Sequence, residues 1–556
     1  MKKTNYSDEL RSILSDHIFI LCVLLTVVLT YGFATFNVTV SIDDLEGERY
    51  VGSGNAMLAA GRFTITLLSV LFGYGAKVLQ NAYAIDILAI TGLIWSAANF
   101  CILFRRICKD AFTREAGIVF SCIFLSYPLM HEIWEYTGAN LCVSFGFWAD
   151  SIVLLLMYDV IHEHTPGRWK KILLSTVLMM FVCAGYESLV PVYVFTVFAL
   201  LALQVIYGPQ REKQLLVILR QGILYAAVLA VGLLLRILVH KAILFTLDLG
   251  QDINGSTFIY WGNIPTRSIL KHLLLSWSKD YVLKGLIYLP IAELVIAGTL
   301  FLIPAFIACQ KHGLVLLLPG VGMYLSLVIL SLMQGTVSLY RSCQVFGMFV
   351  AFVLMYLVMC MHQKKNVAFQ KGMLLLCCIL CFEQASCNSY YITLNHQRSQ
   401  EEAHVVQEIG TDLHSQFDLK KPVIFVGGYA LSETIVEGAS VPEDSIRWRL
   451  LETLYSKLST VLLDKYAENF MNYFHLSRKI PQSTINSNIS FCEYPFEGNQ
   501  DGMQRLFAYY GFDHIPANYA SVYPEAQNYI AEYTMPAYPR DGYIQDVGDY
   551  IIVHIG

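Results

Sequence analysis

The first long apolar run of the chain, HIFILCVLLTVVLTYGFATF (17–36), contains no Asp, Glu, Lys or Arg and is soon followed by the acidic segment SIDDLEGERY (41–50). A helix of about 20 apolar residues is long enough to cross the hydrocarbon core of a bilayer. Lys2, Lys3 and Arg11 precede the run, and no small-residue cleavage site follows it. We therefore expect a retained membrane anchor with a cytoplasmic N-terminus rather than a cleaved signal peptide.

The composition extends this interpretation to the whole chain. Of the 556 residues, 56% are hydrophobic and 15% are charged, whereas an ordinary soluble protein is about 25% charged. The net charge of -5 and the lack of a basic stripe exclude a nucleic-acid interface. Only Cys492 of the 14 cysteines lies beyond residue 390, so that region cannot form an internal disulfide. We expect partners that are lipidic, or polar and uncharged.

Eleven segments are expected to cross the membrane as helices. They are residues 17–36, 82–104, 115–130, 141–160, 172–185, 188–206, 215–239, 282–308, 313–332, 343–362 and 372–389. Basic side chains gather in alternate loops, which places those loops in the cytoplasm. They are Arg105, Arg106, Lys109 and Arg114; Arg168, Lys170 and Lys171; Arg211 and Lys213; Lys311; and Lys364, Lys365 and Lys371.

Two segments could change the number of membrane crossings. Residues 62–80 are apolar but interrupted by two glycines, so we expect a re-entrant or interfacial helix there. Residues 172–206 are expected to form a tight hairpin, because Gly185 and Pro191 bracket a polar turn. One long helix over 172–206 is the alternative, and it would reverse the orientation of everything downstream.

Charged residues return after residue 390. The apolar stretches KPVIFVGG (421–428) and DYIIVHIG (549–556) predict strands, and EEAHVVQEIGTDLHSQF (401–417) predicts a helix. Mixed strand and helix signals over this length favour a soluble α/β domain. The expected fold is thus a polytopic α-helical membrane domain over 1–389, with its first outer loop at 37–81, followed by an extracytoplasmic α/β domain over 390–556.

Acidic side chains crowd the segment that follows the first crossing. Carboxylates beside hydrocarbon are costly unless they face water, a metal or a substrate, so this segment is a candidate site. A solvated acidic loop is the alternative interpretation. No GxxxxGK[ST] or GxGxxG motif occurs here, so a nucleotide ligand is not expected. The candidates are Asp43 and Asp44 for catalysis, and Glu46, Glu48 and Arg49 for binding the sugar or the acceptor.

Arginine is the expected ligand for any phosphate, because its planar fork binds phosphate oxygens bidentately. The best candidate is Arg341 in QGTVSLYRSCQVF (334–346), at the outer end of the tenth crossing. A snorkelling interfacial arginine is the alternative. The cations Arg62, Arg236 and Lys241 are further candidates for the phosphate, and the flanking residues Tyr340 and Gln344 are candidates for binding the sugar or the acceptor.

Two further outer loops, HEIWEYTGAN (131–140) and GYES (185–188), carry polar and aromatic side chains. Carboxylates suit sugar hydroxyls and aromatic rings suit sugar C–H faces, although Trp and Tyr also simply mark membrane interfaces. The HEH triplet at 162–164 is interpreted as a solvated loop rather than a zinc site. The candidate sugar-binding residues of the two loops are His131, Glu132, Glu135, Tyr186 and Glu187.

The anchor, the paired aspartates of the first outer loop, the step Gly61, Arg62, Phe63 and the terminal α/β domain together resemble a known family. The layout is similar to that of the bacterial membrane glucosyltransferases of the serotype-converting, O-antigen glucosyltransferase II-like type, within the GT-C class. This resemblance implies transfer of a hexose, glucose above all, from undecaprenyl phosphate to a surface polysaccharide or teichoic-acid-like polymer. It also implies a multi-pass protein of the bacterial cytoplasmic membrane.

The chemistry of such a transfer fits the candidate residues. A phosphate leaving group departs without protonation, so one general base and phosphate-binding cations suffice. We expect Asp44, or else Asp43, as the base and Arg341 at the phosphate. Mg²⁺ or Mn²⁺ held by this acidic pair is an open alternative, because hard oxygen ligands suit both ions. The rival class is a non-enzymatic transporter, lipid-linked-glycan or proton-coupled, for which the intramembrane acids Asp150 and Glu293 would serve.

The alternation of basic loops places the chain beyond residue 390 outside the cell. A reporter enzyme fused after Gly556 should therefore be active only in the exported compartment. Activity of that fusion in the cytoplasm would contradict the count of crossings, most directly at 62–80 or 172–206.

Overall fold

The computed structural model describes most of the chain. The described residues are 5–45, 56–72, 79–162, 167–208, 214–249, 260–262, 264–276, 313–336, 338, 340–363, 367–438 and 500–556, with residue 453 and isolated residues between 297 and 310.

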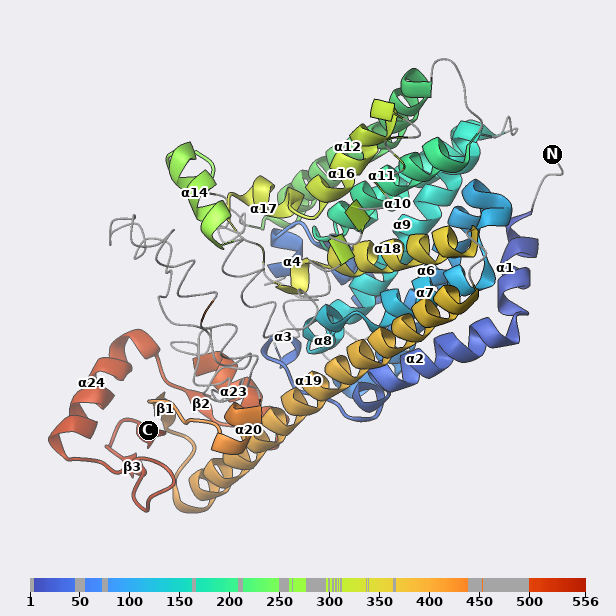
Figure 1. The fold of residues 1–556 in the computed structure, drawn as a ribbon. Coiled ribbons are helices and arrows are strands. Elements are labelled where there is room, and N and C mark those ends of the chain that lie inside the picture. Colours follow the sequence, from blue (N-terminus) through green and yellow to red (C-terminus); the bar gives the residue numbers. More distant parts are fainter. Residues whose placement is uncertain are drawn as a thin grey trace.

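Long apolar helices form one bundle (Figure 1). Its helices are α2 (His17–Phe36), α6 (Ala82–Cys108), α7 (Arg114–Ser126), α9 (Thr137–His162), α10 (Arg168–Cys183), α11 (Leu189–Tyr207), α12 (Gln214–Leu247), α16 (Leu317–Ser326), α18 (Val345–Gln363) and α19 (Val367–Gln416). Within the described residues, eight helical segments are long and apolar enough to span a membrane. The chain therefore has the character of a polytopic membrane protein.

The predicted crossings agree with these helices in most places. The hairpin at 172–206 is present, since α10 and α11 are separated by a turn at Gly185. Residues 313–332 are divided between α16 and the short α17 (Ile329–Gln334). Of 62–80, the described part forms α5 (Phe63–Leu71) and the start of a 3-10 turn (Leu79–Asn81). The nine residues of α5 rise about 14 Å and cannot cross about 30 Å of hydrocarbon. Most of 282–308 lies outside the described residues, so the total of eleven stays a prediction.

Ion pairs join the basic loops at one end of the bundle. Arg106 binds Glu9 and Asp159, each at 2.6 Å, and Lys171 reaches the other oxygen of Asp159 at 2.5 Å. Glu9 belongs to α1 (Tyr6–Leu14), an amphipathic helix ahead of the anchor. Two of the basic loops thus share one end with the N-terminal helix, as the sequence predicts. The first turn of α9 lies at the opposite end, because Asp159 is near the last turn of that helix.

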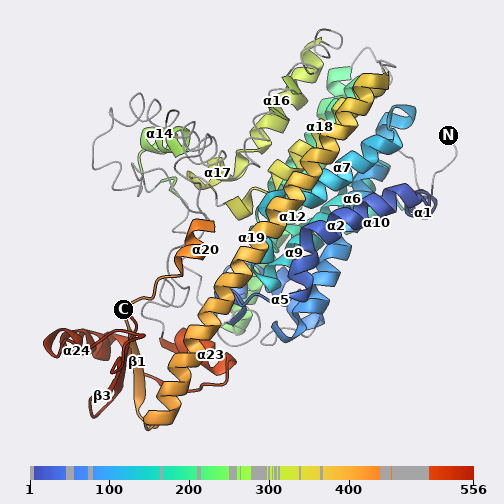
Figure 2. The ribbon, with the colours of Figure 1, turned by 60° about the horizontal axis from the view of Figure 1, so that its bottom comes forward.

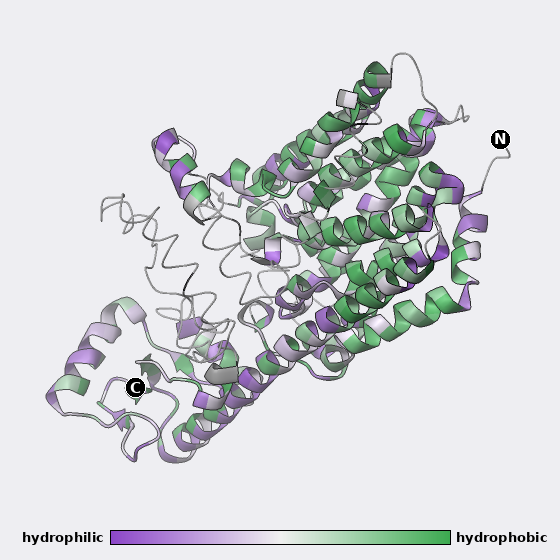
Figure 3. Ribbon diagram, in the orientation of Figure 1, coloured by the Kyte–Doolittle hydropathy of each residue, from purple (hydrophilic) through white to green (hydrophobic). Residues whose placement is uncertain are grey.

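Helix α19 leaves the bundle and continues into a separate layer of structure (Figures 1 and 2). Its 50 residues correspond to about 75 Å. Asn388 anchors it in the bundle by donating to the carbonyls of Ser126 and Tyr127 at 2.7 and 3.1 Å. Its colour changes from mixed apolar to polar along its length (Figure 3). The predicted boundary at residue 390 falls inside this helix, because polar helix-forming residues continue it without a break.

A four-stranded sheet follows α19, in the order β2-β1-β4-β3. The strands are β1 (Pro422–Val426), β2 (Ile515–Pro516), β3 (Ile544–Asp546) and β4 (Ile551–His554), so both strands expected from the sequence are present. β1 runs parallel to β2 and β4, and β3 is antiparallel to β4. We call this sheet, with α20 (Glu433–Gly438), α23 (Gln500–Tyr509), α24 (Tyr519–Glu532) and residues 405–416 of α19, the sheet domain.

The sheet domain is built in layers. On one sheet face, Val406, Ile409 and Leu413 of α19 pack with Phe507 of α23 against β1 and β4. Ala526 of α24 packs on the other face. The alternation of strand side chains between the two faces explains why both stretches are apolar throughout.

Close packing within the sheet domain gives a test at Gly410 of α19. A Cβ at this buried position would overlap the ring of Phe512. We expect Gly410→Ala to destabilise the protein by about 1–3 kcal/mol, the usual cost of overpacking, in thermal unfolding of the detergent-solubilised chain. Gly372→Ala, on the same helix but with open space around the position, is the control and should be neutral or slightly stabilising. Equal stability of the two variants would contradict this packing.

Candidate functional site

Asp44 is buried against the start of α9. It lies on the single-turn helix α3 (Ile42–Leu45) and is only 2% exposed. Its Oδ2 accepts hydrogen bonds from the Thr137 amide at 3.0 Å and the Ser41 hydroxyl at 2.8 Å, and its Oδ1 accepts one from the Gly138 amide at 3.2 Å. Free amides and the positive end of the helix dipole stabilise an anion at this place.

A second buried carboxylate rests on the same turn of α9. Asp86, near the start of α6, accepts a hydrogen bond from Asn140 Nδ2 at 2.5 Å, and the two residues are 6% and 0% exposed. Asn140 Oδ1 has no hydrogen-bond partner among the described residues. Asp86 was not among the residues predicted from the sequence. Its position as an acidic residue inside the apolar segment 82–104 could have identified it as a candidate.

Arg341 is held by the segment that leads into α9. Its backbone amide donates to Glu132 Oε2 at 2.9 Å, its Nη1 donates to the Tyr136 hydroxyl at 3.1 Å, and its guanidinium lies 5.3 Å from the centre of that ring. Gln344 Nε2 donates to the Arg341 carbonyl. Since Tyr136 binds Arg341 and Thr137 binds Asp44, adjacent residues hold the expected base and the expected phosphate ligand.

Arg62 and Arg236 form a second basic group around one carboxylate. Glu187 Oε2 lies 3.1 Å from Arg62 Nη2, and Glu187 Oε1 lies 3.2 Å from Arg236 Nη2. Glu187 raises the pKa of Arg62 further above its ordinary value, so this guanidinium stays charged. Gly61 has a φ of +75° and faces His240 and Arg236, so a side chain there would be both strained and crowded.

Tyr186 connects the two basic groups. Arg62 lies 5.4 Å from the centre of its ring. Burial raises the pKa of the Tyr186 phenol, while Arg341, Arg62 and a hydrogen bond with Ser342 act in the opposite direction. Tyr186 is therefore a neutral phenol close to both Arg62 and Arg341. Tyr186, in the hairpin between α10 and α11, thus lies near two of the candidate phosphate ligands, Arg62 and Arg341.

The remaining predicted residues are less closely tied to this region. His131 is buried, stacks on Tyr391 at 4.7 Å, and places Nδ1 2.6 Å from the Pro128 carbonyl, an arrangement typical of packing. Lys241 is exposed on α12, and Glu135 is partly exposed at the end of α8 (His131–Trp134). Outside the description lie the side chains of Asp43 and Tyr340 and the whole of Glu46, Glu48 and Arg49.

Metal binding is not tested by these residues. Among the described residues, no group of three or more His, Cys, Asp or Glu side chains is arranged to hold a metal ion. Asp43 and Asp44 as metal ligands therefore remain a prediction. His162, from the HEH triplet, stacks on Tyr158 at 4.2 Å toward the other end of α9.

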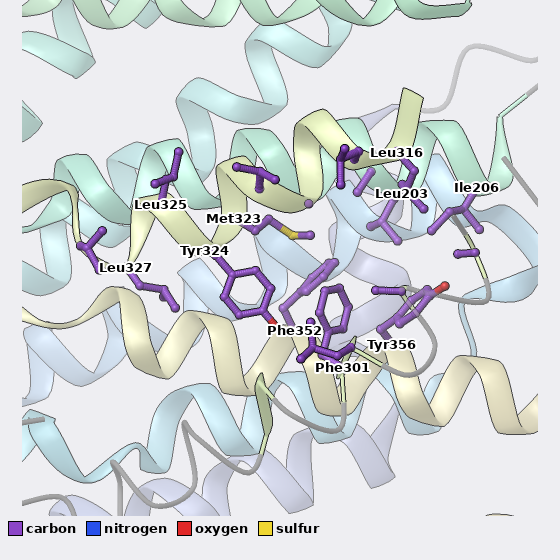
Figure 4. Close-up of a pocket in the computed structure, with 18 residues that line it drawn as sticks. Leu203, Ile206, Phe301, Leu316, Met323, Tyr324, Leu325, Leu327, Phe352 and Tyr356 are labelled. Carbon is purple, nitrogen blue, oxygen red and sulfur yellow. The ribbon is translucent and has the colours of Figure 1, made fainter. Parts of the chain in front are cut away.

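A half-open apolar cavity of about 1100 Å³ lies at the side of the bundle (Figure 4). Helices α11, α16 and α18 line it together with Phe301, and its polar side-chain groups are the hydroxyls of Tyr324 and Tyr356. Phe352 of α18 lines it seven residues after that helix begins, about 10 Å along the axis from the Arg341 end. The cavity suits a long apolar ligand.

One comparison with known proteins identifies a family. The family model described as glucosyl transferase GtrII matches residues 32–358. The match includes Asp44, Arg62, Glu187, Arg236 and Arg341 and ends before α19. No curated protein and no solved structure matches the chain.

Proposed function

Because the chain belongs to the GtrII glucosyltransferase family, we propose that it transfers a glucosyl group from a polyprenyl phosphate to a glycan on the outer face of the membrane. The observation that carries the proposal is the placement of Asp44 and Arg341 on adjacent residues, Thr137 and Tyr136, within the matched region. This placement supports a shared site in which Asp44 would act as the base and Arg341 as the phosphate ligand. The acceptor is a surface polysaccharide or a teichoic-acid-like polymer.

Asp44 acts as the general base in this proposal. The acceptor hydroxyl oxygen forms a bond to the anomeric carbon, the bond from that carbon to the phosphate oxygen breaks, and the hydroxyl proton passes to the carboxylate. An ionised carboxylate accepts hydrogen bonds at both oxygens, and the Thr137, Gly138 and Ser41 donors hold that of Asp44 in a fixed orientation. The alternative role of Asp44 is purely structural, as a cap supplied to α9 from another segment.

Arginines receive the phosphate that leaves. Arg341 is the proposed bidentate ligand, because its fork matches two phosphate oxygens and no proton is needed for departure. Arg62 and Arg236 share the single carboxylate of Glu187, so this group keeps one positive charge in excess. It supports the developing negative charge electrostatically.

The apolar cavity supports a lipid-linked donor. It holds no charged side chain among its described lining and lies beyond Arg341 along α18. A polyprenyl chain gains favourable burial from apolar walls of this kind. A phosphate at Arg341 and a tail in the cavity would place the sugar at the end of the bundle where Asp44 lies.

A transporter is the rival function. Asp150 of α9 is fully buried, and neither of its carboxylate oxygens has a hydrogen-bond partner among the described residues. Buried intramembrane acids of this kind often carry protons. Purified protein should form a glycosidic bond between synthetic polyprenyl-phosphate glucose and a surface glycan, and a transporter would not.

The role of Arg341 is tested by Arg341→Lys, which keeps the charge but loses the fork. Loss of a charge-assisted hydrogen bond costs about 1.5–3 kcal/mol, so kcat/KM for the lipid-linked donor should fall about 10- to 100-fold. Arg220→Lys, the same change at an exposed position of α12, is the control and should leave kcat/KM unchanged. If Arg341→Lys transfers as well as the parent, Arg341 only anchors the chain at the interface.

The role of Asp44 is tested by Asp44→Asn, which keeps one carbonyl oxygen for an α9 amide but cannot accept the proton. Loss of a general base reduces kcat about 10²- to 10⁴-fold, whereas a weakened cap costs about 0.5–2 kcal/mol of stability. We expect the large loss of kcat, measured beside thermal unfolding, with donor binding retained. Asp43→Asn is the companion variant. A stability loss with near-normal kcat at Asp44 would leave only the capping role.

A further inference from the structure

We propose that the sheet domain, which lies outside the matched family region, positions Asp44 for transfer through the neighbouring residue Leu45. This proposal rests on the proposed function of Asp44 as the base. In this proposal Leu45 is a positioning residue, and the sheet domain contributes to the geometry of the active site.

Helix α3 cannot hold its own geometry. It is a single turn of four residues, and the first turn of a helix costs more conformational entropy than its hydrogen bonding returns. The position of Asp44 must therefore be set by whatever packs around α3. Neighbouring elements are α9 on one side and α23 of the sheet domain on the other, and Figure 1 shows α3 between α8 and the sheet domain.

Leu45 lies where two hydrophobic cores meet. Its partly buried side chain packs against the core of the helical bundle and also against the core of the sheet domain, which contains Leu506 and Phe507 of α23. Asp44, one residue earlier, is bonded to the amides of α9. Two adjacent side chains thus tie α3 to the bundle and to the sheet domain at once.

The segment before α3 is also fixed to α19. The Val40 amide donates to the Ser399 hydroxyl at 3.2 Å, and Phe33 lies edge-on to the His396 ring at 5.5 Å. His396 and Ser399 lie on α19 between Leu394 and Val405, which both belong to the sheet-domain core, and follow Ile392 of the bundle core. A displacement of the sheet domain would therefore shift the segment that carries Asp44 from both ends.

Small displacements are sufficient to matter. A misplacement of about 1 Å at a reacting group can cost about 100-fold in rate. We therefore expect Leu45→Ala to lower kcat about 10- to 100-fold with little change in KM for polyprenyl-phosphate glucose. Leu45→Met, which nearly conserves the volume, should restore most of the loss.

A second readout does not depend on activity. The Thr137 and Gly138 amides are protected from hydrogen exchange when they donate to Asp44. In the full-length protein, Leu45→Ala should speed exchange of these amides about tenfold, and Leu45→Met should not. The control is Leu413→Ala, which removes a buried leucine of α19 from the same sheet-domain core but leaves Leu45 in place, and should leave both the exchange and kcat per folded molecule unchanged.

The two readouts separate the possible failures. Unchanged exchange at Thr137 and Gly138 in Leu45→Ala would overturn the positioning role, whatever the activity. A parent protein that forms no glycosidic bond would instead overturn the proposed function, and the exchange result would still decide whether Leu45 holds Asp44. Equal effects of Leu45→Ala and Leu413→Ala would show that only the stability of the sheet domain had changed.

Discussion

The hydrogen bonds from the first turn of α9 to Asp44 are the interaction on which the site depends. A carboxylate that is almost fully buried is costly unless donors satisfy it, and the free amides of Thr137 and Gly138 are the donors here. These hydrogen bonds join the segment around Asp44 to helix α9, which begins more than 90 residues later in the chain. Asp86 reaches the same turn through Asn140, so the start of α9 gathers acids from two other parts of the chain.

The segment from Glu132 to Gly138 contacts both Asp44 and Arg341. Glu132 and Tyr136 bind Arg341, and Tyr186 lies close to both Arg341 and Arg62. Three loops at one end of the bundle therefore meet, although each is bound to the others by only a few side-chain contacts. Helix ends and buried carboxylates anchor these loops. A helical scaffold can hold reacting groups in fixed positions in this way.

Local patterns in the sequence predicted the apolar helices, the hairpin at Gly185 and the strands around Ile424 and Ile552, because hydropathy and period depend on neighbouring residues. The types of site residue were also accessible, since arginines and acids are expensive beside a membrane. The pairing of Asp86 with Asn140 could not be predicted, because a sequence pattern shows that a side chain is buried but not which side chain it contacts. The continuity of α19 was missed for a related reason: hydropathy divides an apolar half from a polar half, while the helix itself does not change.

Contacts between distant segments decide the rest, and the most consequential one joins Leu45 to the sheet domain. The family match ends before α19, yet α23 packs against the short helix that carries Asp44. Under the proposed transfer, the donor arrives from the bilayer and the acceptor from water, so the reacting groups must sit where a membrane bundle and a water-exposed domain adjoin. Under the proposed role of Asp44, a base on a one-turn helix between the two is positioned by contacts with both. The position of Asp44 is then a property of the packed interface, which explains why so short an element lies at the point where both cores meet.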